Sequence, residues 1–453
     1  MRRRTSVIGI IVMAVLGVSG GNAVRAADEA AAARRGPLKD LPSKPTGEHL
    51  AKVKALGDNQ WVNLGSPAPD PKWGKAAGRS WAPRMAYAPD MRGAFFTGEG
   101  PHGRVKSNGY GMDDVWFYDA NQHRWICVYP GTPARGGYKE VISIDPETGF
   151  EVDKDGNPVP VAVGVHAYMQ VTYDTDRKCF MRTTCGSYLG AKIKGRKEAR
   201  EAYKEAKKKE EEAPEGDKED RPEKNYKSPW IYSTVEHRWE RYRCEKPHKR
   251  FKISGFGSTL VYVPSVEKAF AFRKRSYAFG WYNPEKREWS VIKRKGEAPP
   301  WDMDSNSCYD SKRDRIYMGG GIYPVIEKGK SALYAFDVQS EKFIHLKPEK
   351  DPGLQTYSSN NAMFFYDSAN DAAVLFMHDS SKKNGTGPGI YAYHPEENRW
   401  ETVAEKPGAY DVKMINPHWS GYYDPELNAH LMYVATDGRA NGTMWAYRYK
   451  RKK

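Results

Sequence analysis

The sequence lacks a long apolar run after its first residues. Its mean hydropathy is −0.79, and only SVIGIIVMAVLGVSG is continuously apolar. Because a membrane-spanning helix needs about 20 apolar residues, the rest of the chain offers no candidate. The apolar run follows MRRRT and precedes small residues around Ala26. This pattern predicts a secretory signal peptide over 1–26, cleaved near Ala26, and a secreted or periplasmic protein. The arginines also permit a twin-arginine signal, which the residues after them do not support.

Cysteine is scarce and forms no C-x-x-C pair. The five cysteines are an odd number, so at least one is unpaired within a monomer. The sequence also lacks a P-loop, a dinucleotide fingerprint, the spacing of a zinc site and a Ser-His-Asp order. We therefore predict no cofactor and no metal site.

Aromatic residues, glycine and proline are plentiful. Aromatics make up 13 %, with 42 Gly and 30 Pro, a composition typical of strands and turns. Six segments share a tyrosine, a tight turn and a second β-rich run, as in TYDTDRKCFMRTT and FYDSANDAAVLFM, so each predicts a hairpin. We call their tyrosines the anchor tyrosines: Tyr87, Tyr173, Tyr262, Tyr309, Tyr366 and Tyr423.

A second hairpin motif follows each of the first five segments. It pairs two aromatics seven residues apart, as in Tyr118 and Trp125 or Tyr393 and Trp400. In the sixth unit the first aromatic is Tyr447, but the partner would fall beyond residue 453. The missing strand is found near Trp61, before the first unit. An N-terminal strand that completes the last unit closes a ring and removes an exposed sheet edge.

Six units of four strands with this closure predict an all-β, six-bladed β-propeller over 59–453, one domain preceded by a leader at 27–58 with a short helix. The Tyr-Asp turn, the aromatic pairs and the glycines at 319–321 resemble the kelch-repeat family, which includes the central domain of galactose oxidase. The double glycine of that family is clear only in the fourth unit. The chain is thus identified as a divergent member, and function transfers poorly from fold alone.

Two insertions interrupt the repeats. Residues 131–164 predict an extra β-ribbon with two turns. One turn resembles part of a calcium loop at Asp153, Asp155 and Asn157 but lacks the later acidic ligands, which favours a hairpin turn. Residues 191–228 predict a charged, exposed helical arm with Glu/Lys pairs at helical spacing. Solvation of this arm and docking of a partner are both open interpretations.

The chain is basic, with a formal charge of +15 that falls to +11 after signal cleavage. Residues 240–297 carry a net charge of +9 from 15 basic and 6 acidic residues. This balance allows an anionic partner. Strand periodicity explains the aromatics in this stretch, and export argues against nucleic acid, so none is expected. No membrane span is expected after signal cleavage.

The long connections all lie on one predicted face of the ring, where binding residues are commonly placed. The first residues of each inner strand rim the central funnel at that face. Amides and Arg bind hydroxyls and carboxylates, and indoles pack on sugar rings. The predicted ligand-binding rim is Trp81, Arg84, His166, Tyr168, Trp301, Asp304, Asn306, Asn361, His418 and Trp419.

Two classes of function fit this rim. The first is recognition of an extracellular polar or anionic glycan, or of a protein partner, on the long-loop face. The alternative is a carbohydrate-active enzyme, either a polysaccharide lyase or a sugar mutarotase. A lyase would use Arg84 to neutralise a carboxylate and His166 or His418 as a base. A copper radical centre like that of galactose oxidase is disfavoured, because the Tyr393-His394 pair lies on the wrong face.

Overall fold

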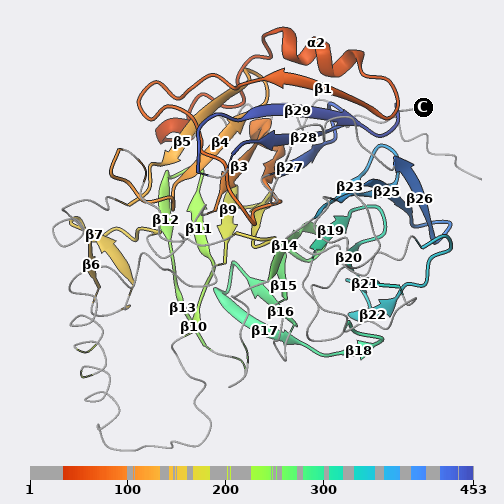
Figure 1. Ribbon diagram of the computed structural model, residues 1–453. Helices are drawn as coiled ribbons and strands as arrows, with labels where there is room; N and C mark the ends of the chain where they lie inside the picture. Colours follow the sequence, from red (N-terminus) through yellow and green to blue (C-terminus); the bar gives the residue numbers. More distant parts are fainter. Residues whose placement is uncertain are drawn as a thin grey trace, which may run out of the picture.

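The computed structural model describes most of the predicted propeller (Figure 1). The described residues are 34–98, 106, 108–132, 142–145, 148, 150–160, 167–183, 201, 205, 226–245, 247, 251, 258–272, 279–299, 306–319, 331–351, 362–377, 389–404, 419–436 and 438–451. The predicted signal peptide lies outside them, as does most of the predicted helical arm at 191–228. No helix in the described part of the chain is long and apolar enough to cross a membrane.

The described strands form six antiparallel four-stranded blades, which confirms the predicted fold class. Blade 1 contains β2 (Ala86–Ala88), β3 (Gly93–Thr97), β4 (Val115–Asp119) and β5 (Arg124–Tyr129). Blade 2 contains β8 (Val171–Asp174), β9 (Cys179–Arg182), β11 (Trp230–Ser233) and β12 (Arg238–Glu240). Blade 3 contains β14 (Thr259–Val263), β15 (Lys268–Phe272), β16 (Phe279–Asn283) and β17 (Glu288–Ile292).

Blades 4 to 6 repeat this arrangement. Blade 4 contains β19 (Asn306–Asp310), β20 (Arg315–Gly319), β21 (Leu333–Asp337) and β22 (Lys342–His345). Blade 5 contains β23 (Ala362–Asp367), β24 (Ala372–Met377), β25 (Gly389–His394) and β26 (Arg399–Ala404). Blade 6 contains β27 (Trp419–Asp424), β28 (Ala429–Val434), β29 (Thr443–Arg448) and β1 (Gln60–Gly65). In blade 4, β18 (Lys295–Gly296) adds a fifth, parallel strand beside β22.

The first strand of each blade faces the ring centre. Each of these inner strands contacts the inner strands of the two neighbouring blades, and β2 contacts β27, so the ring is closed. The six inner strands are β2, β8, β14, β19, β23 and β27.

The N-terminal strand closes the last blade as predicted. β1 pairs with β29, and Trp61 stands opposite Tyr447, so the orange β1 runs beside the dark blue β29 in Figure 1. Asn59, two residues before Trp61, accepts a hydrogen bond from the Tyr447 hydroxyl at 2.7 Å. Asn398, two residues before Trp400, binds Tyr393 in the same way at 2.9 Å. The closing strand therefore supplies from the other end of the chain the turn contact that intact blades make locally.

The turns explain the repeated Tyr-Asp motif. The residue five positions after each anchor tyrosine has a left-handed φ of 45–55°, which tightens the turn between the first two strands. In blade 4, Oδ1 of Asp310 accepts the N–H groups of Lys312 at 2.9 Å and Arg313 at 3.1 Å. Such a carboxylate caps the turn backbone. Blades 1 and 3 use short 3-10 helices instead: η2 (Pro89–Met91) and η4 (Pro264–Val266).

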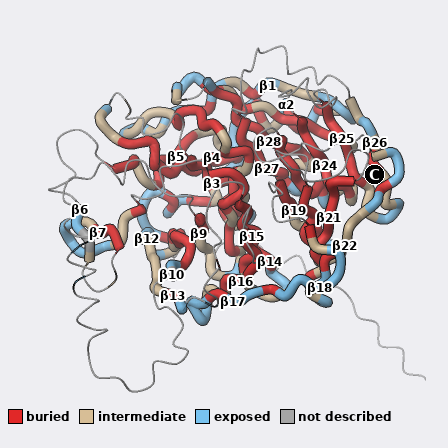
Figure 2. Tube along the Cα trace, turned by 60° about the horizontal axis from the view of Figure 1, so that its bottom comes forward, coloured by how far each residue is buried: buried red, intermediate tan, exposed pale blue. Residues whose placement is uncertain are grey.

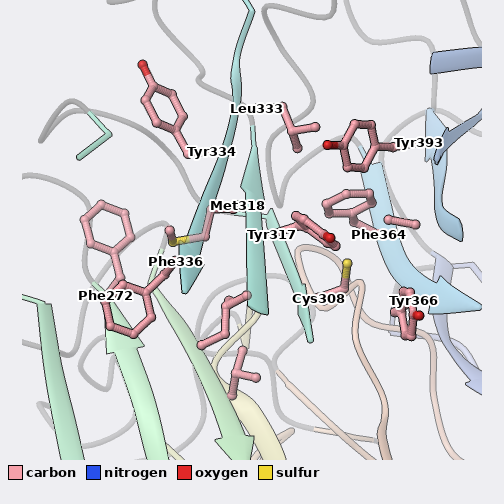
Figure 3. Packing of buried hydrophobic residues seen from close by; sticks show 14 of the residues in the cluster. Phe272, Cys308, Tyr317, Met318, Leu333, Tyr334, Phe336, Phe364, Tyr366 and Tyr393 are labelled. Atoms are coloured by element: carbon pink, nitrogen blue, oxygen red, sulfur yellow. The ribbon is translucent and has the colours of Figure 1, made fainter. Parts of the chain in front are cut away.

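Aromatic side chains fill the space between adjacent blades. The first three strands of each blade are mostly buried, whereas exposed residues gather at turns and on outer strands such as β17 (Figure 2). At the junction of blades 4 and 5, Cys308, Phe364 and Tyr366 belong to one buried cluster (Figure 3). The hydrophobic effect across these blade faces is the main favourable contribution to the ring.

Several small elements lie outside the blades. They are η1 (Gly36–Leu38), α2 (Glu48–Ala55) and two ribbons, β6 (Ile142–Ile144) with β7 (Glu151–Asp153) and β10 (Tyr226–Lys227) with β13 (Arg243–Cys244). His49 of α2 hydrogen-bonds to the carbonyl of Ala120 at 2.8 Å, which attaches the helix to blade 1. Oδ1 of Asp153 accepts the N–H groups of Asp155 and Asn157, the arrangement of a hairpin turn.

Candidate functional site: the mouth of the central channel

The anchor tyrosines form a ring around the channel. Each is the penultimate residue of its inner strand, so all six lie at the same level, close to the turns that follow. Every hydroxyl is engaged. Four tyrosines bind the residue five positions ahead: Tyr87 to Arg92, Tyr309 to Asp314, Tyr366 to Asp371 and Tyr423 to Asn428, at 2.6–3.1 Å. The other two donate to an acid in the first turn of the preceding blade: Tyr173 to Asp90 of blade 1 and Tyr262 to Asp176 of blade 2.

Polar contacts join each blade to the next around the ring of anchor tyrosines. From here on, the rim means this ring and the turns beside it, and the ten residues predicted from the sequence are called the predicted rim residues. Arg313 of blade 4 binds both oxygens of Asp371 in blade 5, at 2.6 and 2.8 Å. Arg92 of blade 1 pairs with Asp424 of blade 6 at 2.9 Å. The remaining junctions are joined by Tyr173 and Asp90, Arg177 and Glu267, Ser265 and Asp314, and Asn370 and Asn428. Side-chain contacts therefore join all six blades at this rim, and two of its carboxylates, Asp371 and Asp424, pair with arginines.

The anchor tyrosines enclose a pocket of about 300 Å³. All six inner strands contribute, each with its anchor tyrosine and the one or two residues before it. Ser311, Ser368 and Pro425, which follow three of the inner strands, form part of its exposed edge. The pocket therefore opens at the turns between the first two strands of each blade. The binding surface was predicted on the face that carries the long connections. The pocket opens on the opposite face.

Arg84 forms the floor of this pocket and crosses the channel. Its Nη1 donates to the carbonyls of Met169 at 3.3 Å and Leu260 at 2.9 Å. Its Nη2 donates to the carbonyl of Ser307 and to the hydroxyl of Ser307 at 3.1 Å. One guanidinium of blade 1 thus binds blades 2, 3 and 4. The backbone of residues 83–85 also bonds with Gly421 of blade 6 at 2.8 and 3.0 Å.

Burial sets the protonation of the pocket. It raises the pKa of all six anchor tyrosines above the ordinary value, and it raises the pKa of the Cys308 thiol. Burial lowers the pKa of Arg84 to about 10, which still leaves the guanidinium charged at neutral pH. Among the described residues, the lining therefore contains neutral phenols, a neutral thiol and one cation, and no group that titrates near pH 7.

The rim should be sensitive to acid through Asp371. Hydrogen bonds from Arg313, and then from Lys312, hold the pKa of Asp371 well below its usual range. Because the pKa is lower in the folded state, this pair stabilises the fold above about pH 4 and the stabilisation is lost as pH falls further. We expect Asp371→Asn to reduce the fall in the urea midpoint between pH 7 and pH 3. Asp155→Asn, at an exposed carboxylate in a ribbon turn, is the control. An unchanged acid response in Asp371→Asn would contradict this assignment.

Five of the ten predicted rim residues are described. Trp81 and Tyr168 meet at the junction of blades 1 and 2, where the Tyr168 N–H donates to the Trp81 carbonyl at 2.6 Å. Arg84 alone lines the pocket. His166, Trp301, Asp304, Asn361 and His418 lie outside the described residues, so the proposed pairing of Arg84 with either histidine stays a prediction.

Asn306 and Trp419 have a different place from the one expected. Asn306 has no exposed surface, and its Nδ2 donates to the carbonyl of Ala362 at 2.9 Å. Trp419 is 1 % exposed and packs edge-on against Trp61, with ring centroids 5.9 Å apart. Neither side chain presents a surface to a ligand here. The correction has a physical reason: both faces of an inner strand are covered by neighbouring blades, so polar and aromatic residues on it stabilise junctions.

The anchor tyrosines were not predicted as site residues. They were interpreted only as markers of the repeat, although their constant position at the end of each inner strand was visible in the sequence. That constant position is the signal that could have placed them in one ring at the channel.

The comparisons with known proteins give remote structural similarities alone. No family model matches the chain, and no curated protein matches it. Among solved structures, the chain is remotely similar to the GH74 enzyme of Niastella koreensis (11 % identity, TM-score 0.41, covering 84 % of this chain and 55 % of that one). A structural genomics protein of unknown function from Bacteroides thetaiotaomicron is similar at 10 % identity and TM-score 0.40, covering 87 % and 73 %. TolB from Acinetobacter baumannii is similar at 10 % identity and TM-score 0.30, covering 48 % and 45 %.

The chain thus spans about half the length of TolB and of the GH74 enzyme. The sheets define a six-bladed β-propeller. Membership of the kelch family stays a prediction.

Proposed function

We propose that the protein is an exported, kelch-type recognition propeller that binds a sugar residue of an extracellular glycan in the channel mouth. The observation that carries this proposal is the pocket of about 300 Å³ ringed by one tyrosine from every blade. Its volume is at the lower end of the range typical of small-molecule sites, which suits one ring of a larger ligand. Export rests on the signal sequence predicted over 1–26.

The chemistry of the lining supports a sugar. Tyrosines present an apolar ring with a polar edge, and the phenols are held in place by their bonds to the rim. Thr172, Ser311 and Ser368 bring hydroxyls to the same pocket. Hydroxyls both donate and accept hydrogen bonds, as sugar hydroxyls do. The combination of aromatic walls and small polar groups fits a ligand with apolar faces and polar edges.

The same lining favours binding over catalysis. A lyase or a mutarotase needs a side chain that exchanges a proton near neutral pH. Burial raises the pKa values of the phenols and of the Cys308 thiol, so these groups stay protonated. The enzyme hypothesis therefore requires residues other than the described lining, and His166 and His418 stay its predicted candidates.

Narrowing the mouth should test the site without disturbing the core. Ser311→Trp and Ser368→Trp place large side chains at exposed positions on the edge of the pocket. We expect each variant to weaken glycan binding about tenfold or more, because a bulky group excludes the ligand. Binding to a panel of neutral and uronate oligosaccharides, measured by calorimetry, checks this.

Ser290→Trp is the matched control, since Ser290 is exposed on the outer strand β17, away from the pocket. Equal binding by all three variants would place the ligand elsewhere, and would favour a glycan or protein partner on the long-loop face. Release of unsaturated products from the uronates would support the lyase hypothesis instead.

A further inference from the structure

The pocket contains one charge that no acid neutralises. Of the described residues that line it, only Arg84 is charged. Two carboxylates of the surrounding rim pair with arginines, Asp424 with Arg92 and Asp371 with Arg313. Two others, Asp176 and Asp314, bind anchor tyrosines and lie outside the lining. A ligand in this pocket therefore meets uncharged walls and a single cation at the floor.

The partners of Arg84 are all neutral. Nη1 and Nη2 bind three carbonyls and one hydroxyl, and Arg84 forms no ion pair with a carboxylate of the described residues. Two other buried arginines differ in this respect. Arg34 pairs with Asp90 at 2.5 Å, and Arg79 pairs with Asp114.

Arg448 shows what a purely structural arginine looks like in this chain. It also binds only carbonyls, but it uses Nε, Nη1 and Nη2 to do so, and it does not line the pocket. Arg84 leaves its Nε–H without a partner among the described residues. Nε of Arg79 is likewise unpartnered but is sealed from solvent, whereas Nε of Arg84 is not among the sealed atoms. Arg84 thus keeps a donor available to a ligand.

An anion at this point would recover the cost of desolvating the guanidinium. Burial lowers the pKa of Arg84, because the charged guanidinium has lost hydration. An Arg–carboxylate contact is a strong, charge-assisted hydrogen bond. A carboxylate, with one negative charge, matches one guanidinium, whereas a phosphate dianion would need a second cation that the lining lacks.

We infer that the channel-mouth pocket selects ligands that carry one carboxylate, bound by Arg84, and that its ligand class is a sugar acid. This inference rests on the proposed function, from which it takes the sugar ring. Arg84 provides the charge, and the tyrosine ring provides the walls for the sugar.

The test compares an acid with its neutral twin on the full-length mature protein. The probes are D-galacturonate and its methyl ester, measured by calorimetry with wild type. We expect the acid to bind at least about tenfold tighter, the effect of one charge-assisted hydrogen bond. Equal binding of acid and ester would overturn the charge inference and leave the sugar proposal standing. Benzoate is a third probe: if it binds and neither sugar does, the carboxylate site stands and the sugar class fails.

Variants at Arg84 then separate charge from shape. Arg84→Gln should abolish the preference for the acid over the ester, and Arg84→Lys should keep part of it, both checked first for a native circular dichroism spectrum. Arg177→Gln removes a rim charge outside the lining and should leave the preference unchanged. A preference that survives in Arg84→Gln would overturn the assignment to Arg84. Failure of all three probes to bind wild type would refute both the site and the proposed function.

Discussion

Replacing Arg84 by methionine is expected to lower the free energy of unfolding by about 3 kcal/mol. The Arg84 guanidinium donates hydrogen bonds to the carbonyls of Leu260 and Ser307. A buried carbonyl that loses its donor costs about 1–3 kcal/mol. Met169 loses less, because the Leu260 N–H still donates to its carbonyl at 2.9 Å. Methionine fills a similar volume, so the loss reports polar contacts and not a cavity.

Urea unfolding followed by tryptophan fluorescence measures this effect. Arg177→Met is the matched control, since Arg177 lies on the same rim but is partly exposed and pairs with Asp174 at 3.4 Å. Partly exposed pairs of this kind contribute at most about 1 kcal/mol. If Arg84→Met were as stable as wild type, water would replace the guanidinium freely, and Arg84 would serve the ligand alone.

The ring itself could be predicted because its signals are local. Aromatic pairs at a fixed spacing mark hairpins wherever they occur, and hairpins depend on residues close together in sequence. The closing strand was also predictable, because the last unit lacks the partner of Tyr447 and the segment around Trp61 has no unit of its own. The role of Asn59 was not predictable in the same way, since its hydrogen bond to Tyr447 joins residues 388 positions apart.

The site was harder to predict because its contacts join different blades. Arg84 was selected from the sequence, but the Ser307 it binds is 223 positions away. These contacts between distant residues decide on which side of Arg84 the pocket lies. The length of the loops pointed to the opposite face, and loop length says nothing about where the channel is closed. Arg84 crosses the channel near the first residues of the inner strands and leaves a pocket toward the short turns.

The anchor tyrosines show a second reason why the site was hard to predict from the sequence. A residue that recurs in every unit is explained by the fold, so its repetition conceals any further role. Here the same side chain does both: Tyr366 holds its turn through Asp371 and lines the pocket. The six-fold repetition that builds the ring also builds a symmetric wall around its centre.

Replacing Trp419 by alanine is expected to destabilise the fold by about 3–5 kcal/mol, the usual cost of deleting a buried aromatic. From the sequence, Trp419 was expected to touch a ligand, so that its loss would weaken binding without unfolding. Its burial reverses that expectation. The indole lies at 1 % exposure in a cluster with Met363, Phe376 and Trp61.

Trp61 belongs to the closing strand β1, and Trp419 belongs to the inner strand β27. Variants of this pair therefore test whether ring closure depends on contacts between these two side chains. Trp61 contacts both Trp419 and Phe376 of blade 5 at centroid distances of 5.9 Å. We expect the double variant Trp61→Ala/Trp419→Ala to lose less than the sum of the single losses, by about 1 kcal/mol, the coupling typical of an aromatic pair. Trp445→Ala, at a partly buried tryptophan of β29 in the same blade, is the control and should lose less stability than Trp419→Ala.

Additive losses in the double variant would mean that β1 is held by its backbone pairing with β29 alone. Coupled losses would mean that the N-terminal strand closes the ring through side chains that reach toward the inner strand. In that case closure and the polar layer at Arg84 are linked through β27, because Trp419 begins the strand whose Gly421 bonds to the backbone beside Arg84.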